Sequence, residues 1–428
     1  MSCGVCASCG GEPFRGTLTY TSPAHGGWGV ARMGQLLPES YQLFAGPAAC
    51  GRHGALSACL QGRKDTIAYL YLSEDDIVSG GYEWAIADGA EELLAWLKKR
   101  GRTPRVMMIF VTCLDDLLGT DHEALAAELH ERHPEVRFID CHMNPITTDT
   151  KVPPAVNIRN KIYSTLDVAE RKDGGVNLIG SLVPLLKDGE YYDLLARMGA
   201  APARQITDFS TFDGFQQMAR SRLNVVLAPP GVYAAEQMEK KHGTPWLRAL
   251  VSYDPREVTK MYRALAAALG ADCPDLSGYE AACEEDFART REVLDGLPVV
   301  LDGDAVTRPF DLARALLERG FRVKRLIVQD VVASDAENYR WLRERCAEVE
   351  IIQPQDPRRV LFRDRFPECL CIGYNSGYIT GSRRVVPADA QQGHWGYRGV
   401  AAMLEMIRAA AGAEIDLKDM VKKAGLVL

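Results

Sequence analysis

The sequence lacks the features of a membrane protein or a disordered chain. No apolar run approaches the roughly 18 residues that cross a bilayer, and the longest, such as Val106–Val111, have the length of a strand. Apolar residues make up 47% and charged residues 25% of the 428 residues. Such a chain buries enough apolar surface to offset the entropy of ordering. Its length predicts about two to four domains.

The start of the chain and its net charge restrict location and partners. Met1–Gly4 lacks the charged-then-apolar pattern of a signal peptide, so we expect a cytoplasmic protein. The formal net charge of −7 argues against broad electrostatic binding of nucleic acid. Because cytoplasmic thiols stay reduced, we interpret the 12 cysteines as metal ligands, reactive thiols or buried residues rather than disulfides.

Several catalytic motifs are also missing. The chain has no G-x-x-x-x-G-K-[ST] phosphate loop, no G-x-G-x-x-G after a strand, no G-x-S-x-G and no H-E-x-x-H. It is therefore not expected to hydrolyse ATP by the phosphate-loop route. The turn Leu301–Asp304 could offer a helix N-terminus to an anion, but its two carboxylates would repel one. A capped helix start is the favoured interpretation.

Short apolar runs alternate with helical patterns along the whole chain, which is typical of βαβ units and parallel sheets. The expected strands are Ile67–Leu72, Val106–Val111, Val136–Ile139, Val225–Leu227, Val299–Leu301, Val323–Val328, Val349–Ile352 and Cys369–Ile372. The expected helices are Trp84–Arg100, Asp121–Arg132, Pro255–Leu269, Tyr279–Leu294, Arg308–Arg319 and Ala336–Cys346.

This rhythm predicts an α/β fold of three doubly wound, Rossmann-like αβα subdomains with mainly parallel sheets. We place the boundaries at residues 1–155, 156–278 and 279–428, the last with a C-terminal helical tail. The first junction is the Pro- and Thr-rich segment Asp149–Val156, and the second is Gly270–Gly278. In open α/β sheets ligands bind outside the carboxyl ends of the strands. Candidate sites are therefore Cys113 and the turns after Leu301 and Ile372.

The cysteines carry the clearest chemical signal. Cys3, Cys6 and Cys9 form C-x2-C-x2-C, a spacing that lets several thiolates face one soft metal, as in cubane iron–sulfur clusters. Structural zinc is the alternative, but no second C-x2-C exists outside this run. His130 and His133 are one helical turn apart, in a helix expected to be solvated.

Two further cysteines stand at turns that suit a ligand. Cys50 follows the Gly46–Pro47 turn and precedes Gly51, which leaves room beside its thiol. Cys113 follows the strand Val106–Val111. The remaining cysteines are interpreted as small buried residues: Cys59, Cys141, Cys273, Cys283, Cys346, Cys369 and Cys371.

Ordered blocks along most of the chain resemble the nitrogenase component 1 superfamily. The blocks are Gly46–Cys50, Asp76–Gly81, Thr112–Cys113 with Leu118–Asp121, Val176–Gly180, Lys241–Trp246 and Gly396–Gly399. This superfamily includes nitrogenase molybdenum–iron protein subunits, cofactor-assembly scaffolds, dark-operative protochlorophyllide reductase and nickel-sirohydrochlorin reductive cyclase. Each block is short, and their order and spacing carry the resemblance.

The resemblance implies an iron–sulfur cluster held at a subunit interface by three cysteines of each subunit. Two of these correspond to Cys50 and Cys113, with Gly46 and Gly51 in the Cys50 turn. The third differs, because the family has its first cysteine directly before Ala-Phe-x-Gly, whereas here Pro13 precedes Phe14–Gly16. Cys9, four residues upstream, is the nearest thiol, with Cys6 and Cys3 behind it. A [4Fe-4S] cluster is expected rather than an eight-iron form.

The resemblance also sets expectations for activity. The family's iron–molybdenum cofactor needs a Cys where this chain reads Ala228–Gly231, and a His-Ser-Trp phrase that is missing before Gly396, although His394 stands nearby. We therefore expect an ATP-dependent reductase without that cofactor, acting on a small-molecule or tetrapyrrole-like substrate. Its partners would be an iron-protein-like ATPase and an identical or paralogous subunit.

Other functions and roles stay open. The chain could instead be a non-catalytic scaffold for metallocofactor assembly, or a plain α/β small-molecule-binding protein. Asp115, Asp116 and His53 flank the candidate ligands and could supply protons, but surface or capping roles are favoured.

Overall fold

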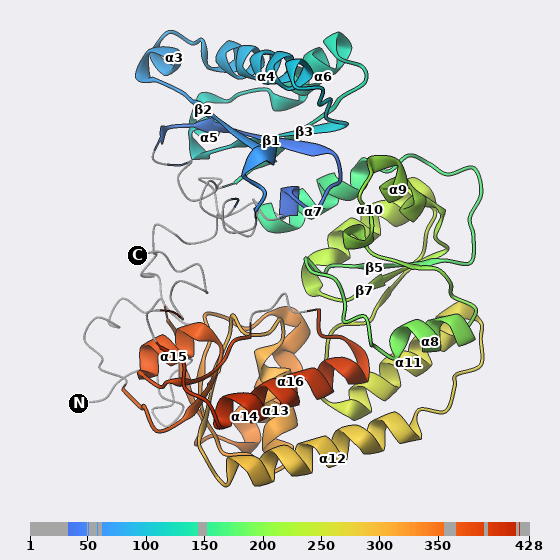
Figure 1. Cartoon of the computed structure of the whole chain (residues 1–428), viewed down its shortest axis with the longest axis vertical. Coiled ribbons are helices and arrows are strands. Elements are labelled where there is room, and N and C mark those ends of the chain that lie inside the picture. Colours follow the sequence, from blue (N-terminus) through green and yellow to red (C-terminus); the bar gives the residue numbers. More distant parts are fainter. Residues whose placement is uncertain are drawn as a thin grey trace.

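The computed structural model describes residues 33–48, 50, 58, 62–143, 152–354, 365–388, 393–416 and 419. These residues form three α/β subdomains, each built around its own sheet (Figure 1). The predicted fold class is confirmed. The residue boundaries predicted between the subdomains stay a prediction.

The first subdomain has a four-stranded sheet in the order β2-β1-β3-β4, in which all pairings are parallel. Its strands are β1 (Ser40–Gly46), β2 (Ile67–Tyr71), β3 (Val106–Val111) and β4 (Arg137–His142). Its helices are α3 (Glu74–Val78), α4 (Tyr82–Lys99), α5 (Cys113–Leu118) and α6 (His122–Arg132). Every residue of β1 and β3 is buried, as expected for strands covered on both faces.

The second subdomain has a parallel sheet in the order β6-β5-β7-β8. Its strands are β5 (Val176–Ile179), β6 (Ala203–Arg204), β7 (Leu223–Val226) and β8 (Trp246–Arg248). The helices associated with it are α7 (Pro154–Ser164), α8 (Tyr191–Arg197), α9 (Phe212–Gln216) and α10 (Val232–His242). Helix α7 lies between the first and second sheets (Figure 1).

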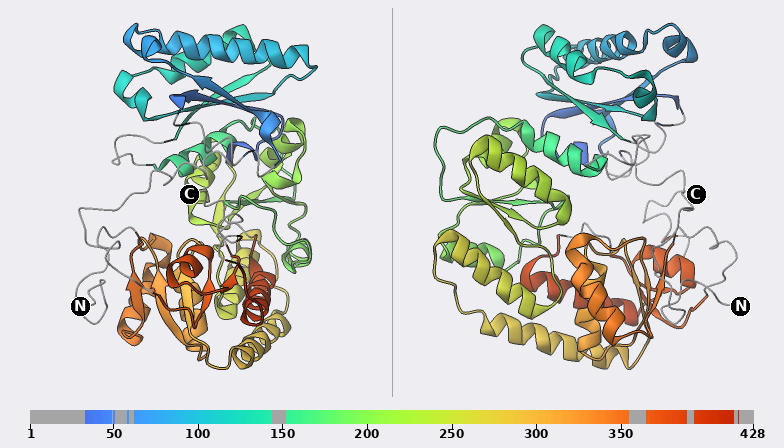
Figure 2. Two further views of the ribbon diagram at one scale, coloured as in Figure 1. Left: turned by 60° about the vertical axis from the view of Figure 1, so that its left-hand side comes forward. Right: turned by 180° about the vertical axis from the view of Figure 1, so that it is seen from behind.

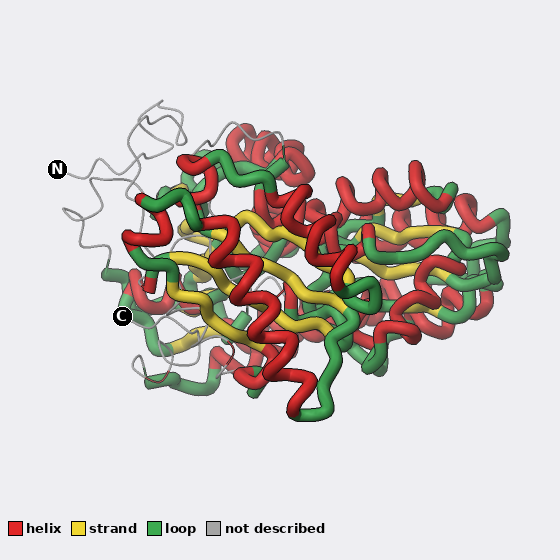
Figure 3. Tube along the Cα trace, turned by 90° about the horizontal axis from the view of Figure 1, so that it is seen from above, coloured by secondary structure: helices red, strands yellow, loops and turns green. Residues whose placement is uncertain are grey.

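The third subdomain has a five-stranded parallel sheet in the order β11-β10-β9-β12-β13. Its strands are β9 (Val299–Asp302), β10 (Val323–Ile327), β11 (Glu350–Ile352), β12 (Leu370–Ile372) and β13 (Arg384–Val386). Its helices are α13 (Pro309–Glu318), α14 (Ala336–Arg345), α15 (Tyr374–Thr380) and α16 (Gly396–Ala411). Helices α11 (Pro255–Leu269) and α12 (Ser277–Leu294) lead into it, and strands alternate with helical layers in Figure 3.

Each sheet contains one switch point, the position where successive strands are added on opposite sides. The switch points lie between β1 and β3, between β5 and β7, and between β9 and β12. The connections after the two strands diverge there, which opens a crevice at the carboxyl edge where ligands bind in doubly wound folds. The chain therefore offers three equivalent places for chemistry.

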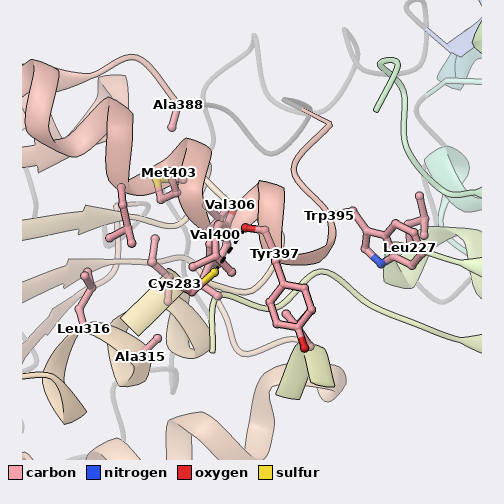
Figure 4. Packing of buried hydrophobic residues seen from close by; sticks show 14 of the residues in the cluster. Leu227, Cys283, Val306, Ala315, Leu316, Ala388, Trp395, Tyr397, Val400 and Met403 are labelled. Carbon is pink, nitrogen blue, oxygen red and sulfur yellow. Dashed lines mark hydrogen bonds between the residues drawn. The ribbon is translucent and has the colours of Figure 1, made fainter. Parts of the chain in front are cut away.

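Continuous hydrophobic cores join the subdomains. Phe44 and Phe110 stack with ring centroids 4.6 Å apart, in a cluster that also contains Ile162 of α7 and Val226 of the second sheet. A second cluster joins the second and third sheets and includes Trp395, whose Nε1 donates to the Ala249 carbonyl at 2.9 Å. Figure 4 shows this packing, and the two further views in Figure 2 show the order of the three subdomains along the long axis.

The expected strands and helices within the described residues are found, with small shifts at their ends. One cysteine interpretation is wrong: Cys273 is exposed, because it lies in the connection between α11 and α12. Cys346 is only partly buried, whereas Cys141, Cys283, Cys369 and Cys371 are buried. None of the described helices combines the length and apolarity needed to cross a membrane.

Candidate functional site

The first switch point brings Cys50 and Cys113 to the same edge of the first sheet. The chain turns directly after β1, where the Cys50 backbone N–H donates to the Pro47 carbonyl at 2.9 Å. Cys113 is the first residue of α5, directly after β3 and the capping residue Thr112. Both thiols are exposed although the strands that carry them are buried.

The two thiols are close enough to interact electrostatically. Burial, and then the Cys113 thiolate, raise the pKa of Cys50. Two thiolates that repel each other in this way suit a bound cation, which reverses the effect and stabilises both charges. Gly46 allows the approach, since a Cβ there would lie 2.7 Å from Cγ2 of Thr112.

A buried carboxylate holds the start of α5. Asp115 is 2% exposed, and its Oδ2 accepts hydrogen bonds from the Tyr82 hydroxyl at 2.7 Å and from the Thr112 backbone N–H at 3.2 Å. Its Oδ1 lies 2.7 Å from Nε2 of the buried His122. Asp115 therefore has the capping role favoured by the sequence, but it is not a surface residue. It orients the helix whose first residue is Cys113.

Exposed apolar side chains surround this edge. Val78 of α3 is 87% exposed, Trp84 in the first turn of α4 is 78% exposed and Leu117 of α5 is 71% exposed. Tyr71, at the end of β2, is also exposed. Helices α3 and α5 lie at the same end of the first subdomain (Figure 1). We call these four residues the apolar rim, and large exposed apolar side chains of this kind are one mark of a protein–protein interaction site.

The second switch point carries a cavity of ≈170 Å³. Gly180 follows β5 with φ +104°, and its missing Cβ lets the backbone approach Ala228 after β7. Arg159 of α7 reaches the cavity from the junction with the first subdomain, and His394, before α16, reaches it from the third. Residues of the second and third subdomains therefore line one cavity.

The third switch point is filled by its own hydrogen bonds. Asp302, at the end of β9, accepts from the Asp304 backbone N–H at 3.0 Å and from the Ser376 backbone N–H at 2.9 Å. Asn375 donates to the Asp304 carboxylate at 2.7 Å. The predicted helix-capping role of this turn is therefore correct in kind, but the helix it caps is α15 rather than the next helix in sequence.

The described residues do not by themselves form a complete metal site. Within the ranges described, no group of three or more His, Cys, Asp or Glu side chains is arranged to hold a metal ion. Cys50 and Cys113 fit two ligand positions of a thiolate-bound cluster, because they are exposed, adjacent and free of disulfides. Four thiolates hold a cubane cluster. The other predicted site residues, Cys3, Cys6, Cys9, Gly51 and His53, lie outside the described residues, as does the side chain of Asp116.

This arrangement defines an α/β protein with a thiolate pair at a sheet edge and a separate cavity between subdomains. The family described as nitrogenase component 1 type oxidoreductase matches residues 26–411, so the chain belongs to that family. Members of this family bind metal–sulfur clusters and work with an iron protein, which supports an iron–sulfur cofactor and an oxidoreductase activity in general terms.

Two solved structures share the fold. The structure titled "Nitrogenase Cp1 at pH 6.5" has a TM-score of 0.70 and 16% identity, with 95% of each chain covered. The structure titled "Nitrogenase Cp1 at pH 5" has a TM-score of 0.65 and 15% identity, with 94% of this chain and 92% of that chain covered. The likeness thus extends over all three subdomains.

Sequence reasoning missed Tyr82, His122 and Arg159. Tyr82 and His122 lie 31 and 9 residues from Cys113 in the chain and meet it only through Asp115. Arg159 had no motif around it, and its signal was only a charged residue within an otherwise half-buried helix, α7.

Proposed function

We propose that this chain is the catalytic component of a nitrogenase-like, ATP-dependent reductase. It would receive low-potential electrons from a separate iron protein through an iron–sulfur cluster at a subunit interface, and deliver them to a small-molecule or tetrapyrrole-like substrate. Because the chain has no phosphate loop, ATP would be hydrolysed on the partner. A cytoplasmic location is part of the proposal.

The observation that carries the proposal is the exposed Cys50–Cys113 pair at the first switch point. The two thiols are far apart in the sequence but lie at the same edge of the first sheet, where both are exposed. When bound, an iron–sulfur cluster supplies one-electron transfer at low potential. Cys50 and Cys113 would ligate it, Gly46 keeps the space between their turns open, and Asp115 fixes the backbone of Cys113.

The apolar rim supports a second subunit at this edge. A two-fold related copy, or a paralogue, would bring two more thiols to the pair and complete a set of four. Cys9 is the alternative source of a further ligand, with Cys6 or Cys3 in its place. Burial of the rim would also remove its apolar surface from water.

The cavity at the second switch point is the proposed place for the substrate or the part of it that is reduced. It lies between the subdomains, and its lining includes no cysteine among the described residues.

The test is an anaerobic measurement of absorption, iron and acid-labile sulfide on the wild-type chain and on Cys50→Ala and Cys113→Ala. We expect brown wild-type protein with iron and sulfide in equal amounts, and loss of most of both in each variant. Cys273→Ala is the matched control, because Cys273 is equally exposed but lies away from the edge. Colourless, metal-free wild-type protein would reject the proposal and favour a plain α/β binding protein.

Turnover separates a reductase from an assembly scaffold. With a reduced iron protein and ATP, a reductase consumes electrons catalytically when its substrate is present. A scaffold would hold the same cluster but release a metallocofactor without net turnover.

A further inference from the structure

The cavity at the second switch point contains a guanidinium to which the described part of the chain supplies no carboxylate partner. Arg159 donates through Nη1 to the Ala155 carbonyl of its own helix at 3.2 Å, while its Nε is buried and has no hydrogen-bond partner. None of the described carboxylates forms an ion pair with it. Burial lowers the pKa of Arg159 to about 10, which still leaves it charged at neutral pH. A partly buried cation to which the described residues offer no counter-charge is costly unless something compensates it.

The surroundings of Arg159 do not compensate the charge. None of the described residues that line the cavity is Asp or Glu. Most of the lining is apolar, with Leu182, Leu227 and Val251 as examples. The hydroxyl of Ser181 is occupied, since it donates to the Val183 carbonyl at 2.7 Å. The enclosure therefore has a net positive wall and a low local dielectric, in which an anion is attracted strongly.

A second feature of the cavity favours negative charge. Pro230 lines it two residues before the 11-residue helix α10, so the N-terminal end of that helix lies near the cavity wall. Its N-cap, Gly231, has no side chain to satisfy the N–H groups of the first turn, of which the Val232 N–H already donates to the Pro229 carbonyl. Helix N-termini attract anions. The N-terminal end of α10 and the Arg159 side chain of α7 both favour an anion in the cavity.

We infer that this cavity binds a carboxylate of the substrate and that Arg159 is the residue that selects it. The planar guanidinium matches a carboxylate with two parallel N–H···O bonds. The volume of ≈170 Å³ suits a short carboxylic acid or one acid arm of a larger molecule. This inference rests on the proposed function for its biological meaning, but the binding itself requires no cluster.

The test is calorimetric titration of the anaerobically purified full-length chain with succinate. Succinamide, which has the same shape without charge, and inorganic phosphate are the comparison ligands. We expect succinate to bind at least tenfold more tightly than either. Arg159→Met should weaken succinate binding at least tenfold, and Arg159→Lys should weaken it less, because charge remains without the planar fork.

A matched control uses Arg222, whose Nε is likewise buried without a partner but which does not line the cavity. Arg222→Met should leave succinate affinity within twofold of wild type. Leu182→Trp fills the cavity without changing its charge, and should abolish binding even if Arg159→Met does not fold. Equal affinity in wild type and Leu182→Trp, or in wild type and Arg159→Met, would overturn the inference.

Two other outcomes of the titration also test the inference. Phosphate bound as tightly as succinate would reject the carboxylate assignment. Tight succinate binding by protein that contains no iron would uphold this inference while rejecting the proposed function, so the two can fail separately.

Discussion

The first and third switch points occupy the same position in equivalent sheets, yet they differ in how they are completed. At the third, Asp302, Asp304 and Asn375 satisfy one another and the start of α15. At the first, Cys50 and Cys113 stay exposed within an apolar rim. The fold forms a crevice in both places. The side chains determine whether the protein's own hydrogen bonds fill that crevice or a ligand can bind in it.

The largest expected effect concerns the apolar rim. Leu117→Asp and Val78→Asp each place a charge in the surface proposed to meet a second subunit, where desolvation is costly. We expect the dissociation constant of the oligomer to rise at least 100-fold, roughly 3 kcal/mol, as measured by anaerobic sedimentation velocity. Val293→Asp, on the half-exposed part of α12, is the control and should not change the oligomer. An unchanged oligomer in both rim variants would place the interface elsewhere.

The next effect concerns the third switch point and depends on pH. Burial, and then the charge of Asp304, raise the pKa of Asp302 to about 7. Because this is above the unfolded value, the folded state retains the proton and stability falls as the pH rises from about 4 to about 7. Asp302→Asn removes this titration. The free energy of unfolding of wild type relative to Asp302→Asn should fall by about 2–4 kcal/mol across that window, since one pKa unit corresponds to roughly 1.4 kcal/mol.

Urea unfolding at a series of pH values measures this difference. Asp275→Asn is the control, because Asp275 is an exposed residue whose pKa is lowered by its hydrogen bonds to Ser277. Its slope over the same range should be of opposite sign or flat. A wild type that gains stability relative to Asp302→Asn as the pH rises would contradict the buried, protonated carboxyl group.

A smaller effect is expected at the buried carboxylate behind Cys113. Asp115→Asn leaves one of the groups around it, the Tyr82 hydroxyl, the Thr112 N–H or His122, without an acceptor. The loss of stability should be about 1–3 kcal/mol. We also expect lower iron content, because the backbone of Cys113 loses its support. Asp121→Asn is the control, since Asp121 caps α6 at the surface and Asn caps equally well.

Chemical denaturation and iron analysis on the same preparations test this pair of substitutions. Full iron content in Asp115→Asn would show that the cap stabilises the helix without positioning the ligand. Equal losses in both variants would show that capping in general, rather than this buried carboxylate, controls the site.

The smallest effect separates two cysteine pairs. Cys369 and Cys371 have their sulfur atoms 3.6 Å apart but are buried, and Cys371 Sγ lies 3.2 Å from the Thr380 hydroxyl. The polar contacts of these two thiols come from the protein itself, as do those of the side chains at the third switch point. Cys371→Ala should cost about 1–2 kcal/mol of stability and leave the iron content unchanged. Loss of iron in this variant would show that a cluster site is identified by two neighbouring thiols, whether or not they are exposed.

The three αβα units could be predicted from the sequence, because short apolar runs and helical periodicity are local properties that do not depend on how the units are arranged. The sequence also predicted Cys113 at a strand's carboxyl end, and Cys50 at the turn after Gly46–Pro47. For Asp115 it favoured a surface or a capping role without deciding between them.

Which side chains contact one another depends on the three-dimensional fold. Sequence reasoning treated Cys273 as buried, because a connection between two helices carries no local signal of its exposure. Arg159 could be identified only from the structure, which shows that Gly180, Ala228 and residues of the third subdomain line a cavity with it. Burial and pairing depend on segments that are distant in the chain, and no local pattern records them.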